Sequence, residues 1–129
     1  MQLRLAASGL AIPEQVWARY VHPSRWPQWS PQIRRAELDD GTDRLTASST
    51  GRVVGPLGLP VSFTVTDLNE ADRHWSWQAG VGPIRVGLSH RVVAAATGTR
   101  TELELTGPAV VLIAYAPLAQ FALQRLVRP

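Results

Sequence analysis

Residues 60–80, PVSFTVTDLNEADRHWSWQAG, carry the clearest structural pattern in the chain. Apolar side chains alternate with polar ones on both sides of a turn near Asn69 and Glu70: Val61, Phe63 and Val65, then Trp75, Trp77 and Ala79. A period of two residues is typical of β-strands. The segment therefore predicts two antiparallel strands with one apolar and one polar face, and such a sheet needs cover on one side only.

The elements outside this hairpin follow from the same kind of pattern. Prolines prevent a long helix in the segment HPSRWPQWSP, which therefore forms one helical turn at most, and at least one of its tryptophans should point inward. We expect a strand over 2–8, a short helix from Pro13 to about residue 21, a hairpin within 32–50 that turns at Asp40-Gly41, a loop over 55–60, a hairpin within 84–106 that turns at Thr97-Gly98, and a final helix over 109–127.

The final helix begins with a wholly apolar run, AVVLIAYAPLA, at residues 109–119. This run is shorter than the roughly 20 residues that a membrane-spanning helix needs, and Pro117 interrupts it. We therefore interpret it as a buried helix that covers the apolar face of the sheet, with no membrane span.

Composition excludes several classes of function. The 129 residues are 45% hydrophobic and 18% charged, which suits one globular domain over residues 1–129. The absence of cysteine excludes disulfides and thiolate-bound metals, and the absence of lysine excludes Schiff-base catalysis. The 13 arginines are scattered along the chain, whereas nucleic-acid binders concentrate positive charge, so we expect no nucleic-acid partner. The N-terminal segment lacks the layout of a signal peptide, which favours a cytoplasmic location.

Three stretches, IPEQVWARYVHPSRWPQWSPQIRRAE, VSFTVTDLNEADRHWSW and SHRV with GTRTELELTGP, precede the apolar final helix. In this order they resemble the START-like SRPBCC superfamily, in its polyketide cyclase/dehydrase and lipid-transport branch. The resemblance covers nearly the whole chain. It implies an α+β helix-grip fold, in which a curved seven-stranded antiparallel sheet wraps around a long C-terminal helix, with two short helices after the first strand.

The resemblance also implies a deep, mostly apolar cavity between the sheet and the final helix. Strand parity, the helix sequence and, for Trp26, the proline-rich corner give the residues expected to line it and to bind a ligand: Trp26, Phe63, Val65, Trp77, His90, Leu103, Leu112 and Tyr115. The tryptophans could instead serve only to cap or pack the core. The implied function is binding of a lipid-, polyketide- or isoprenoid-like small molecule.

His90 is the candidate catalytic residue, because it is the one histidine whose strand parity points inward. A cavity imidazole can hydrogen-bond a ligand carbonyl or act as a general base. With help from Tyr115, it would make the protein a polyketide or aromatic cyclase-dehydrase. The alternatives are a core histidine satisfied by its neighbours and a tyrosine that only packs the helix on the sheet. Whether the protein is an enzyme is left open.

The remaining expectations concern partners and single polar residues. The three histidines cannot easily converge, so we expect no metal site, and no motif indicates a cofactor. Asp67 should reach solvent at its strand end or pair with an arginine such as Arg73 or Arg85. A partner-binding module remains a further alternative, and the oligomeric state is open, a dimer included.

Overall fold

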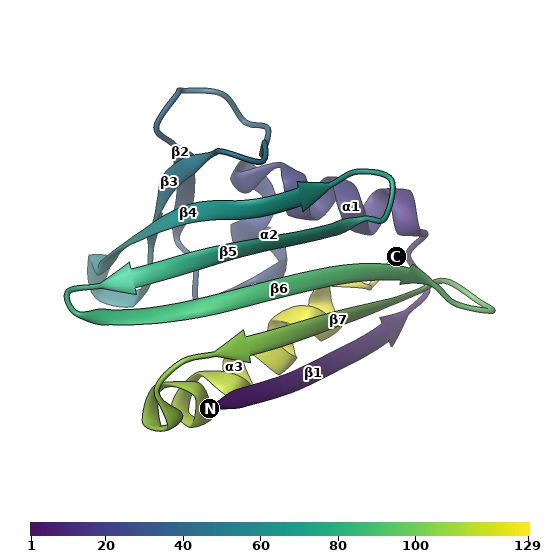
Figure 1. Ribbon diagram of the computed structural model, residues 1–129. Helices are drawn as coiled ribbons and strands as arrows, with labels where there is room; N and C mark the ends of the chain where they lie inside the picture. Colours follow the sequence, from purple (N-terminus) through teal and green to yellow (C-terminus); the bar gives the residue numbers. More distant parts are fainter.

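The computed structural model describes residues 1–129 as one seven-stranded antiparallel sheet whose concave side carries all three helices (Figure 1). The strands lie in the order β1-β7-β6-β5-β4-β3-β2. The elements are β1 (Gln2–Gly9), α1 (Pro13–Val21), a 3₁₀ turn (Pro23–Arg25), α2 (Trp26–Trp29), β2 (Arg35–Leu38), β3 (Thr50–Val54), a second 3₁₀ turn (Pro56–Gly58), β4 (Pro60–Asn69), β5 (His74–Val81), β6 (Ile84–Ala94), β7 (Thr99–Thr106) and α3 (Ala109–Leu126). This is the predicted helix-grip fold.

The sheet buries one face, as the alternation predicts. On β7, Thr101, Leu103 and Leu105 are buried, whereas the residues between them are partly exposed. Each of these residues pairs with one on β1 and one on β6, so the apolar rows of neighbouring strands coincide. The resulting core lies between the concave side of the sheet and the three helices.

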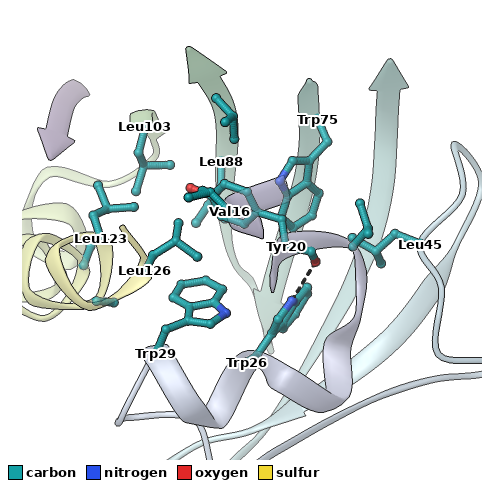
Figure 2. Close-up of a cluster of buried hydrophobic side chains, with 14 of the residues drawn as sticks. Val16, Tyr20, Trp26, Trp29, Leu45, Trp75, Leu88, Leu103, Leu123 and Leu126 are labelled. Carbon is teal, nitrogen blue, oxygen red and sulfur yellow. Dashed lines mark hydrogen bonds between the residues drawn. The ribbon is translucent and has the colours of Figure 1, made fainter. Parts of the chain in front are cut away.

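The proline-rich corner at residues 22–31 closes the end of α1. The backbone carbonyl of Arg19 would bond the amide of residue 23 if the helix continued, but residue 23 is a proline and has no amide hydrogen. Tryptophan side chains supply the missing donors: Trp29 Nε1 donates to the Arg19 carbonyl at 3.2 Å, and Trp26 Nε1 to the Tyr20 carbonyl at 2.8 Å. Both indoles are buried, and Figure 2 shows them projecting inward from α2.

The hairpin predicted to turn at Asp40-Gly41 has its first strand, β2, but no strand follows directly after the turn, so this part of the prediction is wrong. Gly41 does adopt a left-handed conformation, with φ of 78°, but residues 40–49 form a long loop and β3 begins only at Thr50. Leu45 explains the difference, because its side chain is buried and its amide donates to the Val21 carbonyl of α1. The loop is thus held to the helices instead of pairing as a strand.

Asp67 reaches solvent near the end of β4, which is the first of the two expected outcomes, and a bulge sets its direction. The pairing of β4 with β5 shifts between Val65 and Asp67, so Asp67 does not share the inward face of Val65. Its carboxylate is exposed and lies 3.0 Å from Nδ1 of His74, not beside an arginine. Arg73 pairs with Glu14, and Arg85 donates to backbone carbonyls.

Helix α3 covers the concave side of the sheet, as predicted, but only its inner face is buried. It lies on the concave side of the sheet and packs chiefly along β1, with Leu112, Ala119, Ala122, Leu123 and Leu126 buried (Figure 1). By length and composition α3 could cross a membrane, but its inner face is part of the core of this domain.

Candidate functional site

A small apolar cavity lies where α2 and α3 face the middle of the sheet. Its volume is about 30 Å³, and 11 of its 13 lining residues are hydrophobic. The lining residues are Trp26, Trp29, Ser30 and Ile33 from α2 and the segment after it, Trp75, Trp77, Leu88, His90 and Leu103 from the strands, and Tyr115, Ala119, Ala122 and Leu123 from α3. A space of this size holds only one or two water molecules.

Aromatic side chains fill most of the space that the family resemblance assigns to a deep cavity. The rings of Trp75 and Trp77 are stacked at 5.4 Å, and Trp75 is stacked on His90 at 4.7 Å. Trp26 packs against both tryptophans from the helix side, with ring centres 5.8 and 5.5 Å away. The predicted cavity is therefore present but much smaller than expected, because this aromatic cluster occupies one side of it.

His90 belongs to a chain of hydrogen bonds whose direction is fixed by its donors. Trp77 Nε1 can only donate, so Nε2 of His90, at 2.9 Å, accepts and carries no proton. Nδ1 then holds the proton of the neutral ring and donates to the Tyr20 hydroxyl at 3.1 Å. The Tyr20 hydroxyl continues the chain to Thr101, at 2.7 Å. Both imidazole nitrogens therefore have protein partners.

Burial keeps this chain uncharged. It lowers the pKa of His90 to about 3, and the charge of His74 lowers it further. Burial likewise raises the pKa of Tyr20, while its hydrogen bond with Thr101 acts in the opposite direction. At neutral pH the imidazole is neutral. To accept a proton at Nε2 it would have to give up the bond from Trp77.

Two buried polar atoms without protein partners lie at or next to the cavity, one on Trp75 and one on Gln32, which contacts the lining residue Tyr115. Gln32 Nε2 donates to the Tyr115 hydroxyl at 3.4 Å, but Gln32 Oε1 is buried and accepts no bond. Nε1 of Trp75, a cavity residue, is also buried without a partner. Burial raises the pKa of Tyr115, so its hydroxyl stays protonated and can donate. These groups can bind a water molecule or one oxygen atom of a ligand.

The structure places five of the eight predicted site residues at the cavity: Trp26, Trp77, His90, Leu103 and Tyr115. The other three face inward but do not line it. Phe63 lies behind Trp26 and Trp77, with ring centres 5.6 and 5.4 Å away, and Val65 and Leu112 are buried elsewhere in the core.

Several lining residues were not predicted. Trp75 shares the strand parity of Trp77, and Ala119, Ala122 and Leu123 follow the helical spacing of Tyr115, so an extended parity argument could have found them. Ser30 and Ile33 gave no such signal, because they lie in irregular backbone after α2.

The sequence was compared with models of known families, and one model, described as polyketide cyclase / dehydrase and lipid transport, matches residues 10–128. The chain belongs to this family. Its START-like SRPBCC fold thus follows from both the family match and the architecture. A search of curated proteins found no match.

Solved structures of the same fold cover nearly the whole chain. Ara h 8.0201 has a TM-score of 0.75 and 14% identity, covering 98% of this chain and 94% of its own. An uncharacterized protein from Bacillus thuringiensis has a TM-score of 0.78 and 16% identity, with coverage of 98% and 96%. A protein from Nitrosospira multiformis has a TM-score of 0.79 and 13% identity, with coverage of 98% and 94%. At these identities the likeness establishes the fold alone.

Proposed function

We propose that this member of the polyketide cyclase/dehydrase and lipid-transport family binds a hydrophobic small molecule between the sheet and α3. The observation that supports this most is the cavity itself, whose lining is apolar apart from a few polar groups, one of which, Trp75 Nε1, has no protein partner. Apolar walls with a small number of placed polar groups are typical of small-molecule sites. The ligand would be lipid-, polyketide- or isoprenoid-like and carry one oxygen that meets Tyr115 and Gln32.

Binding such a ligand requires the cavity to enlarge, and α3 is the element best placed to move. Its second half is held by buried side chains and by bonds such as Gln120 Nε2 to the Ala6 carbonyl at 3.0 Å. Its first half buries only Leu112, and Pro117 removes one backbone hydrogen bond between the halves. Moving the first half outward, with release of the Gln32–Tyr115 bond, would open the cavity at α2.

The geometry supports binding more than catalysis by His90. A general base must have a free nitrogen within reach of the proton it takes, and its pKa should lie near the working pH. Here Nε2 is occupied by Trp77, and the pKa is about 3. We therefore assign His90 the role of a fixed wall residue that orients Trp77, and we do not retain it as a proton shuttle.

Four of the five tryptophans line the cavity, so intrinsic fluorescence should report binding. The experiment titrates the protein with a panel of fatty acids, isoprenoid alcohols and aromatic polyketides. Ala119→Val would partly fill the cavity and should weaken binding of any active ligand at least tenfold. Ala114→Val is the matched control, because it makes the same change on the exposed side of α3.

Two results would overturn the proposal. One is the absence of saturable binding by every class in the panel. The other is an equal effect of Ala119→Val and Ala114→Val, because the bound molecule would then not occupy the cavity.

A further inference from the structure

The outer face of α3 is apolar along almost its whole length. Val110, Ile113, Leu118 and Phe121 are 81%, 60%, 47% and 45% exposed, and Ala114 and Pro117 are exposed between them. At helical spacing these six residues form one stripe on the side opposite the core. A contiguous exposed apolar surface of this kind marks an interaction site. Only 28% of the residues of this helix are buried within the domain.

Positive charge gathers beside this stripe. The helical layer, residues 13–29 and 109–129, contains four arginines and a single acidic residue, Glu14, whereas the rest of the chain contains nine of each. These two segments therefore carry a formal charge of +3, although the carboxylates of Asp43 and Glu70 reach Ser24 and Trp17 from neighbouring loops.

The four arginines of this layer surround the C-terminal end of α3. Arg125 lies over the ring of Phe121 at 5.9 Å, at the end of the apolar stripe. One open depression of about 240 Å³ is lined by Arg19, Arg125 and Arg128. Burial lowers the pKa of Arg19, and the nearby positive charge of Arg25 lowers it further. None of the four forms a salt bridge, although five other arginines do.

We propose that the outer face of α3 and the four-arginine cluster dock this protein onto a bilayer surface that contains anionic lipids. The inner face of α3 is taken up by the core, so the domain offers a bilayer one exposed apolar stripe with arginines beside it, and such a surface settles in the plane of the headgroups. Lipid phosphates would supply the negative partners that the cluster lacks, and juxtamembrane arginines add affinity for anionic membranes. Because the inner face of α3 remains in the core, the helix would lie flat on the membrane.

Charge argues against a second copy of this chain as the occupant. The helical layer offers no acidic residue except Glu14, which already pairs with Arg73 at 3.3 Å. A dimer formed through α3 would therefore bring arginine clusters to an interface without carboxylates to receive them. The membrane proposal does not depend on the cavity binding a ligand.

The experiment is co-sedimentation of the full chain with phosphatidylcholine vesicles, with and without phosphatidylglycerol. We expect binding that requires phosphatidylglycerol and weakens as salt is raised. Ile113→Glu should reduce it at least tenfold, whereas Val93→Glu on the outer side of the sheet should not. The double variant Arg25→Gln/Arg128→Gln should reduce it about tenfold or more, because each arginine contributes a separate electrostatic attraction. Arg52→Gln/Arg91→Gln removes the same charge from the sheet and should change it little.

A second readout uses the absence of cysteine from the chain. An environment-sensitive dye on Val110→Cys should report an apolar surrounding with anionic vesicles, and the same dye on Thr64→Cys of β4 should stay in water. The proposal is overturned if anionic vesicles bind no protein or if the two arginine pairs have equal effects. It is also overturned if sedimentation shows a dimer that Ile113→Glu dissociates without vesicles present.

Discussion

The Trp77–His90–Tyr20–Thr101 hydrogen-bond chain ties β5, β6, α1 and β7 together at the centre of the core. The partners are buried or half-buried, and the Trp77 indole N–H fixes the direction of the bonds from Trp77 to His90 and from His90 to Tyr20. A buried polar network that is fully satisfied makes a core rigid, and removing one member leaves its neighbours without partners. Two predictions follow from this at the scale of single residues.

The first concerns pH. The pKa of His90 in the folded protein, about 3, lies below the ordinary histidine value of 6.5, so protonation favours the unfolded chain. Stability is therefore fully present above pH 6.5 and is lost as pH falls toward 3, at up to about 1.4 kcal/mol per pH unit. Urea unfolding at pH 7 and pH 5 should show a loss of about 2 kcal/mol. The His90→Gln variant should lack this part of the pH dependence. An identical dependence in both proteins would show that His90 is not held neutral by the fold.

The second compares the two tyrosines of the chain. Tyr20→Phe removes the hydroxyl that accepts from His90 and shares a hydrogen bond with Thr101, and should lower the free energy of unfolding by about 1–3 kcal/mol. Tyr115→Phe removes only one long bond from Gln32, at 3.4 Å, and should cost less than about 1 kcal/mol. Chemical denaturation of the two variants measures both changes. A larger loss in Tyr115→Phe would contradict the description of the network.

At the scale of elements, α3 has two roles with opposite requirements, because one part of the helix must be fixed and the other must be able to move. Its second half must hold the core together, whereas its first half covers the cavity and exposes an apolar stripe. Pro117 lies between the halves, where it removes a hydrogen bond and crowds the preceding turn. We infer that this proline lowers stability and makes it easier for the first half to move.

The prediction for this element is that Pro117→Ala stabilises the protein. Alanine would restore the backbone donor and has the highest helix propensity, while the loss of the proline's restriction on the unfolded chain acts against it. The net gain should be about 1–2 kcal/mol, measured by urea unfolding. In the same variant ligand association should be slower, because the two halves of α3 would move less independently. A loss of stability would mean that the helix is not strained at Pro117.

At the scale of the whole molecule, alternation and helical spacing were enough to predict six of the seven strands, the one-sided core and the final helix. They could not predict features that depend on contacts between distant segments. Leu45 turned an expected strand into a loop by packing beneath α1, and the bulge before Asp67 changed the direction of one side chain. Parity correctly directed His90 inward, but its bonds to Tyr20 and Trp77 depend on how α1 and β5 meet. Whether inward side chains leave or fill a cavity depends on packing, which no pattern encodes.

The most direct test of the central claim follows the five tryptophan indole N–H signals by NMR during titration with a bound hydrophobic ligand. Trp26, Trp29, Trp75 and Trp77 line the cavity, whereas Trp17 lies outside it and donates to Glu70 at 2.7 Å. If the cavity is the binding site, the four cavity signals should shift together, with Trp75 gaining the partner that it lacks, and the Trp17 signal should stay in place. Saturable binding that leaves the four signals unchanged, or that moves Trp17 alone, would contradict the account.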